Sequence, residues 1–265
     1  MPASEVTAKD DRLTLIAISA LACILGDVLH EGLGHGVTAW LSGAHRVTMS
    51  TVALQSDVET RWISANGTLV NLVFAAIFWV LLLRPRRYRP ATRYFFVLAM
   101  AGNLFAGTGY FLFSGVLNFG DWAAVIRGFE PHWMWQLGLV VLGVISYYAS
   151  MLVVAAKLKA FRGKGEAPGR LRALCWTPYF TDGILAGIGG LFNPMGLFYV
   201  IASALPSTLG ANAGLLSLPW MMRGSIPSEE GHVASIPRSA AWIATASAAS
   251  LVFIFVLGRG IAWSR

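Results

Sequence analysis

The sequence is poor in charged residues. Asp, Glu, Lys and Arg together make up 12% of its 265 positions, whereas hydrophobic residues make up 56%. Because a soluble domain usually carries about a quarter charged residues, this scarcity argues against a soluble protein and favours one that contacts lipid. The net charge of +7 does not require a nucleic-acid partner, since most of the excess falls in two short loops. We therefore expect the lipid bilayer, and no nucleic acid, as a partner.

Cysteine is scarce as well. Cys23 and Cys175 stand alone in apolar surroundings, which excludes a disulfide framework and a C-x-x-C motif. We expect both to be small buried residues. The mixed charges of residues 1–12 and the absence of a cleavage site flanked by small residues predict that the first apolar run is a retained helix.

The apolar residues fall into blocks of about twenty, the length that a helix needs to cross about 30 Å of hydrocarbon. The sequence therefore predicts an all-α polytopic membrane protein with about six transmembrane helices. A short apolar stretch, residues 210–222, is expected to be re-entrant or interfacial. Residues 47–54, rich in Val, Thr and Ser, predict a short β-hairpin between the first two spans. The six predicted spans are residues 13–41, 63–83, 94–117, 133–156, 184–205 and 240–257.

Basic residues crowd two loops, one after the second predicted span and one after the fourth. Two spans separate these loops, so both can face the cytoplasm as the positive-inside rule requires. This pattern predicts an integral protein of a bacterial inner (plasma) membrane with cytoplasmic N- and C-termini. The basic residues are Arg84, Arg86, Arg87, Arg89 and Arg93 in the first loop, and Lys157, Lys159, Arg162, Lys164, Arg170 and Arg172 in the second.

A polar segment, His30-Glu31-Gly32-Leu33-Gly34-His35, interrupts the first span near its end. Polar residues are costly in a bilayer and mark function there. The segment is one residue longer than H-E-x-x-H, in which two histidines bind zinc and the glutamate activates water. Five residues apart, the histidines point roughly 140° apart on a regular helix. We therefore predict a π-type bulge, which Gly32 and Gly34 permit.

Two further polar motifs fall at the same predicted depth. Gly67 and Asn71 lie near the start of the second span, and Asp121 follows the end of the third. Together with the segment around Glu31, they resemble the site-2 protease family of intramembrane zinc metalloproteases. Gly67-Thr68-Leu69-Val70-Asn71 looks like that family's G-P-x-x-N element, with Thr68 in the place of proline.

This resemblance covers about the first 125 residues. It implies a metalloprotease core in residues 1–125, with additional transmembrane helices in residues 126–265. The unusual histidine spacing is similar to the H-E-x-x-G-H zinc segment of dipeptidyl-peptidase III enzymes. The function that this resemblance implies is that of a zinc-dependent intramembrane endopeptidase, which cuts a membrane protein or peptide in or near a membrane-spanning segment.

The resemblance also implies roles for single residues. One zinc ion would be held by His30, His35 and Asp121, with Glu31 as the general base. Asp182, in Thr181-Asp182-Gly183, is the alternative third ligand because it resembles the family's Asp-Gly pair. Residues expected to support the site or contact the substrate are Asp27, Gly67 and Asn71.

The resemblance also bears on substrate binding and on the depth of the site. The family's β-element pairs with unwound substrate, a role that the predicted hairpin would share. The family usually has its zinc nearer the cytoplasmic face, whereas the loop charges place this site near the outer face.

If the helix around Glu31 is regular, the sequence predicts a different function. Asp27, Glu31 and His35 would then form one stripe at i, i+4 and i+8. Such a stripe suits an ion-coupled transporter, and an inactive protease relative with a binding role is the other non-proteolytic alternative. Zinc content separates these alternatives from the protease.

Overall fold

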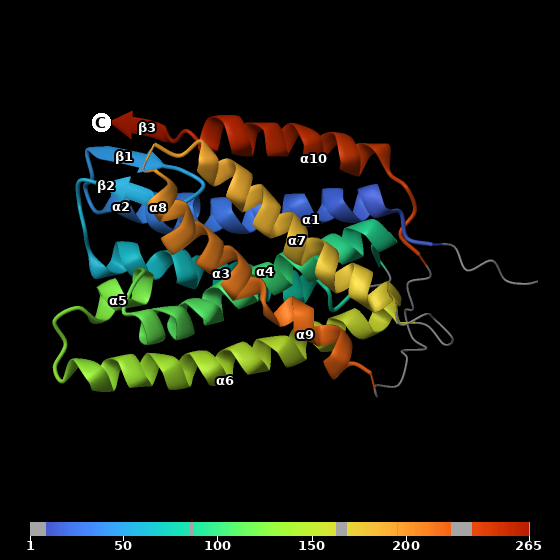
Figure 1. The fold of residues 1–265 in the computed structure, drawn as a ribbon, viewed down its shortest axis with the longest axis horizontal. Helices are drawn as coiled ribbons and strands as arrows, with labels where there is room; N and C mark the ends of the chain where they lie inside the picture. The colour runs from blue at the N-terminus through green and yellow to red at the C-terminus, as the bar shows by residue number, and fades with distance from the viewer. Residues whose placement is uncertain (1–8, 85–86, 163–168, 195, 224–234, 265) are drawn as a thin grey trace, which may run out of the picture.

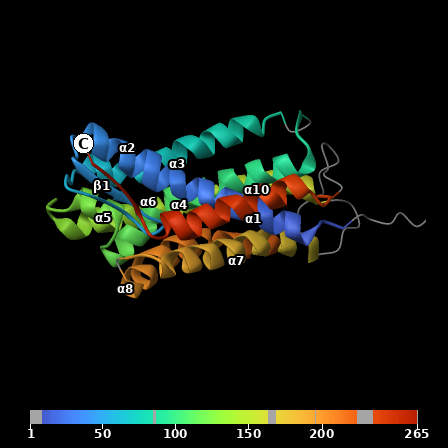
Figure 2. The ribbon, with the colours of Figure 1, turned by 90° about the horizontal axis from the view of Figure 1, so that it is seen from above.

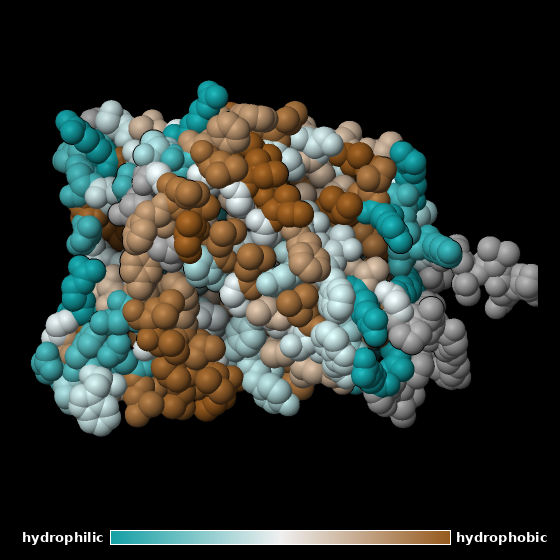
Figure 3. Space-filling model, in the orientation of Figure 1, coloured by the Kyte–Doolittle hydropathy of each residue, from teal (hydrophilic) through white to brown (hydrophobic). Residues whose placement is uncertain are grey.

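The protein is a bundle of long helices with a small sheet at one end (Figure 1). The computed structural model describes residues 9–84, 87–162, 169–194, 196–223 and 235–264. Figure 3 shows hydrophobic side chains dominating the middle of one face, with hydrophilic ones gathered toward its two ends. Within the described residues, five helices are long and apolar enough to cross a membrane. This supports the predicted class, an all-α integral membrane protein.

The first helix has three parts: α1 (Arg12–Asp27), a π-helix (Val28–Gly36) and α2 (Val37–Leu41). The helices that follow are α3 (Arg61–Leu81), α4 (Pro90–Leu117), α5 (Asp121–Ile126), α6 (His132–Leu158, continued by a 3-10 turn, Lys159–Phe161), α7 (Gly169–Leu191), α8 (Leu197–Tyr199), two π-helical turns (Val200–Ala204 and Pro206–Gly210), α9 (Gly214–Met221) and α10 (Ala240–Val252, continued by a π-helical turn, Phe253–Leu257).

Side-chain caps mark where several helices begin. The Asp11 carboxylate accepts a hydrogen bond from the backbone N–H of Thr14 (2.9 Å) ahead of α1. The Thr60 hydroxyl accepts one from the N–H of Ile63 (3.1 Å) ahead of α3. Such caps satisfy donors that the first helical turn leaves unpaired.

One predicted span, residues 184–205, differs from the structure. α7 ends at Leu191, and the chain reverses around Gly196, whose φ of +88° suits glycine. Residues 197–221 then run back along α7. As a result, the indole N–H of Trp176, near the start of α7, donates to the carbonyl of Leu216 (3.3 Å). Hydropathy missed this reversal because the sequence stays apolar on both sides of it.

The return pass changes the relation between the two chain ends. The backbone N–H of Ser239, just before α10, donates to the Thr14 hydroxyl in the first turn of α1 (3.0 Å). Helix α10 therefore runs alongside α1 in the same direction, as Figures 1 and 2 show. The described termini lie at opposite ends of the bundle, which differs from the expectation that both face the cytoplasm.

The predicted hairpin is confirmed as strands β1 (Arg46–Met49) and β2 (Leu54–Ser56), which pair antiparallel. A third strand, β3 (Ile261–Ser264), was not predicted and pairs with the other side of β1. Since the strand order is β2-β1-β3, β2 is an edge strand.

The main hydrophobic core lies between helices from both halves of the chain. Leu15 in α1, Val97 in α4, Val154 in α6 and Leu174 in α7 are almost fully buried in one cluster. Residues 1–125 and 126–265 therefore share this core, and all the predicted metal ligands except the alternative one fall in the first of these segments.

Candidate metal centre

The segment from His30 to His35 is part of a π-helix, Val28–Gly36, so the predicted distortion is confirmed. Backbone hydrogen bonds in a π-helix join residues five apart, which brings positions i and i+5 onto one face. The two imidazoles are buried, at 6% and 7% exposed, and their Nε2 atoms lie 3.1 Å apart. A spacing that a regular helix would not tolerate thus brings both rings to one point.

Asp121 completes a triangle of donor atoms with the two histidines. Its Oδ2 lies 3.2 Å from Nε2 of His30 and 3.4 Å from Nε2 of His35. In the described part of the chain, these are the residues whose arrangement could hold a metal ion.

The turn between α4 and α5 positions Asp121. Asn118 ends α4 in the left-handed conformation (φ 51°), and Gly120 has a φ of +83° that favours glycine. The Ser114 hydroxyl accepts the backbone N–H of Trp122 (3.2 Å), which ties α5 to α4. Burial opposes ionisation of Asp121, whereas the two imidazoles beside its Oδ2 lower its pKa below the ordinary value. The ionised carboxylate is the form that binds a metal ion.

Hydrogen bonds to the opposite ring nitrogens fix both imidazoles. Nδ1 of His30 lies 2.6 Å from Oδ1 of Asn71, and Nδ1 of His35 lies 2.6 Å from the carbonyl oxygen of Ile63. Both partners are acceptors, so each ring carries a proton on Nδ1. In the neutral form of the ring, Nε2 then has a lone pair free to bind a metal ion.

Asn71 is itself held by a residue that the sequence interpretation missed. Its Nδ2 donates to Oδ1 of Asn103 (2.7 Å), and the Asn103 side chain donates to the carbonyl of Ala99 (2.8 Å). Asn71, one of the residues expected to support the site, therefore orients His30. Asn103 could have been found from the sequence, because a single Asn in an apolar span often forms hydrogen bonds between helices.

Gly67 lies directly beneath the donor triangle. A Cβ atom added to it would sit 2.5 Å from Nε2 of His35 and 2.7 Å from Nε2 of His30. Its backbone also packs on Gly34, where an added Cβ would lie 2.5 Å from the Gly67 Cα. The two glycines therefore allow α3 to approach the π-helix closely enough to reach the site.

We expect Gly67→Ala to abolish metal binding while the helical bundle still forms, because the added methyl group occupies the space between the two Nε2 atoms. Metal analysis of the purified variant, with helix content from circular dichroism, checks this outcome. Gly102→Ala is the matched control, since a Cβ there meets nothing within 4 Å. Wild-type metal content in Gly67→Ala would contradict the placement.

Glu31 adjoins the triangle without belonging to it. Its side chain is buried, at 7% exposed, and in the described structure its Oε2 has no hydrogen-bond partner. A buried carboxylate oxygen without a partner is costly. Glu31 is therefore placed to accept a proton from something bound beside it.

Two cavities meet at Glu31. The first, which we call the groove, has a volume of about 430 Å³ and is lined by Glu31, His35, Asp121 and all of β2. The second, the inner cavity, measures about 110 Å³ and extends from His30 and Glu31 toward Cys23 and Asp182. Tyr110 lines both and stacks on His30 with ring centroids 5.0 Å apart. The sequence interpretation missed Tyr110, because an aromatic residue in an apolar span gives no distinguishing signal.

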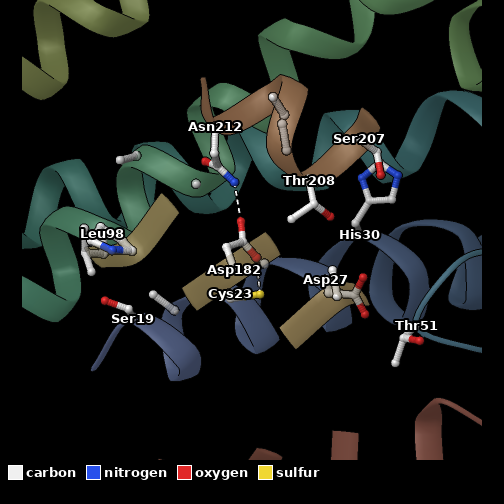
Figure 4. A pocket seen from close by; sticks show the side chains of 18 of the residues that line it. Ser19, Cys23, Asp27, His30, Thr51, Leu98, Asp182, Ser207, Thr208 and Asn212 are labelled. Atoms are coloured by element: carbon white, nitrogen blue, oxygen red, sulfur yellow. Dashed lines mark hydrogen bonds between the residues drawn. The ribbon is translucent and has the colours of Figure 1, made fainter. Parts of the chain in front are cut away.

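The alternative ligand, Asp182, lies away from the histidines. It belongs to α7, where its carboxylate accepts hydrogen bonds from the Cys23 thiol and the Asn212 amide (Figure 4). Asp27 lines the same inner cavity. The structure thus brings Asp121, and not Asp182, to His30 and His35.

No family model matches the chain, and no curated protein or solved structure shows significant similarity to it. The geometry of the site is therefore what indicates the function.

Proposed function

We propose that the protein is a zinc-dependent intramembrane endopeptidase, and the donor triangle is the observation that carries this proposal. Two imidazole nitrogens and one carboxylate oxygen are typical of a catalytic zinc site, which keeps a fourth position open. Ligand atoms about 2.0 to 2.1 Å from a tetrahedral ion lie about 3.3 to 3.4 Å apart. The separations here are 3.1, 3.2 and 3.4 Å, so His30, His35 and Asp121 fit one zinc ion.

When bound, zinc would lower the pKa of a water and polarise a peptide carbonyl. The chain's own residues supply the rest of the chemistry. Glu31 accepts a proton from the attacking water and returns it to the leaving amide nitrogen. Asn71 and the carbonyl of Ile63 hold the two imidazoles in the orientation this requires, and burial shields the site from bulk water.

The groove supports a peptide substrate. One side of β2 pairs with β1, and its other side is an edge of the three-stranded sheet. Strand β2 also lines the groove beside Glu31. An edge strand offers unpaired backbone groups to an extended peptide. We therefore propose that a membrane-spanning or membrane-proximal segment unwinds and adds to β2, which would bring its backbone to the metal centre.

The experiment that tests this proposal measures cleavage of a model transmembrane substrate, together with metal content, in the wild type and in Glu31→Gln. The ion-coupled transporter is less well supported, because it needs Asp27, Glu31 and His35 on one stripe of a regular helix. In the π-helix His35 instead faces Asp121, whereas Asp27 and Glu31 still line one cavity.

The charge pattern supports an orientation in a bacterial inner membrane. Arg170 pairs with Asp10 (2.8 Å), and the Arg93 guanidinium lies 5.8 Å from the Phe161 ring centroid. These contacts place both basic loops at the end of the bundle where α1 begins. By the positive-inside rule that end faces the cytoplasm, which places the metal centre and the C-terminal strand on the other side.

A reporter inserted after Arg162 should then be active only in the cytoplasm, and one fused after Ser264 only outside it. Reporter pairs that function on opposite sides, such as a phosphatase and a fluorescent protein, check this. If both fusions report the same side, the return pass along α7 is wrong. If both report sides opposite to those expected, the orientation is inverted and the site stays as described.

A further inference from the structure

The inner cavity is lined by several acidic side chains, and His30 is the one basic side chain in its described lining. Three carboxylates, those of Asp27, Glu31 and Asp182, line it, and its described lining includes neither Lys nor Arg. Burying ionised carboxylates at this depth is costly unless an opposite charge or hydrogen-bond donors compensate them.

Hydrogen bonds compensate one of these carboxylates, and a bound metal ion would compensate another. Both oxygens of Asp182 accept hydrogen bonds, from Cys23 and from Asn212. Glu31 adjoins the metal centre, whose ion would offset its charge. Asp27 remains, and within the described structure its buried Oδ2 has no hydrogen-bond partner.

A second unpartnered oxygen lines the same cavity. The Thr51 side chain comes from the loop between β1 and β2 and is only 4% exposed, yet its Oγ1 lacks a partner in the described chain. Figure 4 shows Asp27 and Thr51 on the same side of the cavity, with Ser207 and Thr208 across it. At about 110 Å³, the cavity far exceeds the roughly 15 Å³ that one water molecule needs. The oxygens of Asp27 and Thr51 therefore border a space large enough for a partly hydrated ion.

We propose that the inner cavity binds one monovalent cation, sodium, through Asp27 and Thr51. Oxygen ligands suit hard cations, and the hydroxyls of Ser207 and Thr208 with bound water would complete the shell. With the metal centre occupied, Asp27 is the one carboxylate left uncompensated, which favours a monovalent ion over calcium or magnesium. This site is separate from the metal centre and does not depend on proteolysis, but the count of one charge rests on the metal binding proposed above.

The test is sodium binding to the purified full chain in detergent, measured with radioactive sodium at constant ionic strength with choline as the replacement cation. Thermal unfolding in sodium, potassium and choline chloride gives a second readout. We expect saturable binding of one sodium per chain and a higher unfolding temperature in sodium than in choline. Asp27→Asn should weaken binding by about tenfold or more, equivalent to about 1.4 kcal/mol.

Two further variants complete the test. Thr51→Val removes a proposed ligand without changing the charge of the cavity, so it should also weaken sodium binding. This variant keeps the proposal testable if Asp27→Asn does not fold. Glu130→Gln removes an exposed loop carboxylate and should bind sodium like the wild type. Wild-type protein that binds no sodium and unfolds at one temperature in all three salts would overturn the proposal, and would indicate that Asp27 holds a proton instead. Sodium binding that survives in both Asp27→Asn and Thr51→Val would also overturn it.

Discussion

We expect Glu31→Gln to lower the turnover of a model transmembrane substrate by about 10²- to 10⁴-fold, the usual contribution of a general base. The amide has nearly the shape of the carboxylate but cannot accept a proton from the attacking water. Because Glu31 lies outside the triangle of His30, His35 and Asp121, the variant should keep its zinc and its fold. Cleavage assays, metal analysis and thermal unfolding on the same preparation measure all three.

Glu130→Gln is the matched control for this change, since it removes an exposed carboxylate that lines neither cavity. It should cleave at the wild-type rate. If Glu31→Gln also cleaves at that rate, the mechanism proposed here is wrong. A Glu31→Gln protein without zinc would instead make Glu31 a ligand, which the donor triangle does not include.

The second large effect concerns the third ligand. We expect Asp121→Ala to lose most of its zinc at concentrations that saturate the wild type, because it removes one of three protein donors. The loss should exceed that in Asn71→Ala, which removes only the hydrogen-bond partner of His30 and should weaken binding by about 10- to 100-fold. Zinc titration against a competing chelator measures all three proteins.

Asp182→Asn separates the two candidate ligands. Its side chain can still contact Cys23 and Asn212, and it lies away from the histidines, so its zinc affinity should match the wild type. The opposite pattern, with zinc lost in Asp182→Asn and kept in Asp121→Ala, would assign the third ligand to α7. Circular dichroism of each variant excludes unfolding as the cause of metal loss.

The features that depend on local sequence were predictable. Apolar blocks of helical length indicated the membrane bundle, and the Val-, Thr- and Ser-rich stretch indicated the hairpin of β1 and β2. The spacing of His30 and His35, with glycines between them, predicted a distorted helix. Each of these follows from neighbouring residues alone, because hydropathy, strand propensity and helix periodicity act over a few turns of the chain.

The remaining features depend on contacts between distant segments. Both Asp121 and Asp182 were acceptable third ligands by sequence, and only the turn at Gly120 and the packing of α5 against α3 bring Asp121 to the histidines. The return of residues 197–221 along α7 moved the C-terminal strand to the metal-centre end of the bundle and closed the inner cavity. Sequence alone thus determined the class of the fold and most of its apolar helices, and it named the residues whose arrangement could hold a metal ion. Tertiary structure decided which of those residues meet, since a membrane helix can pack in many rotations and directions that its own hydropathy does not distinguish.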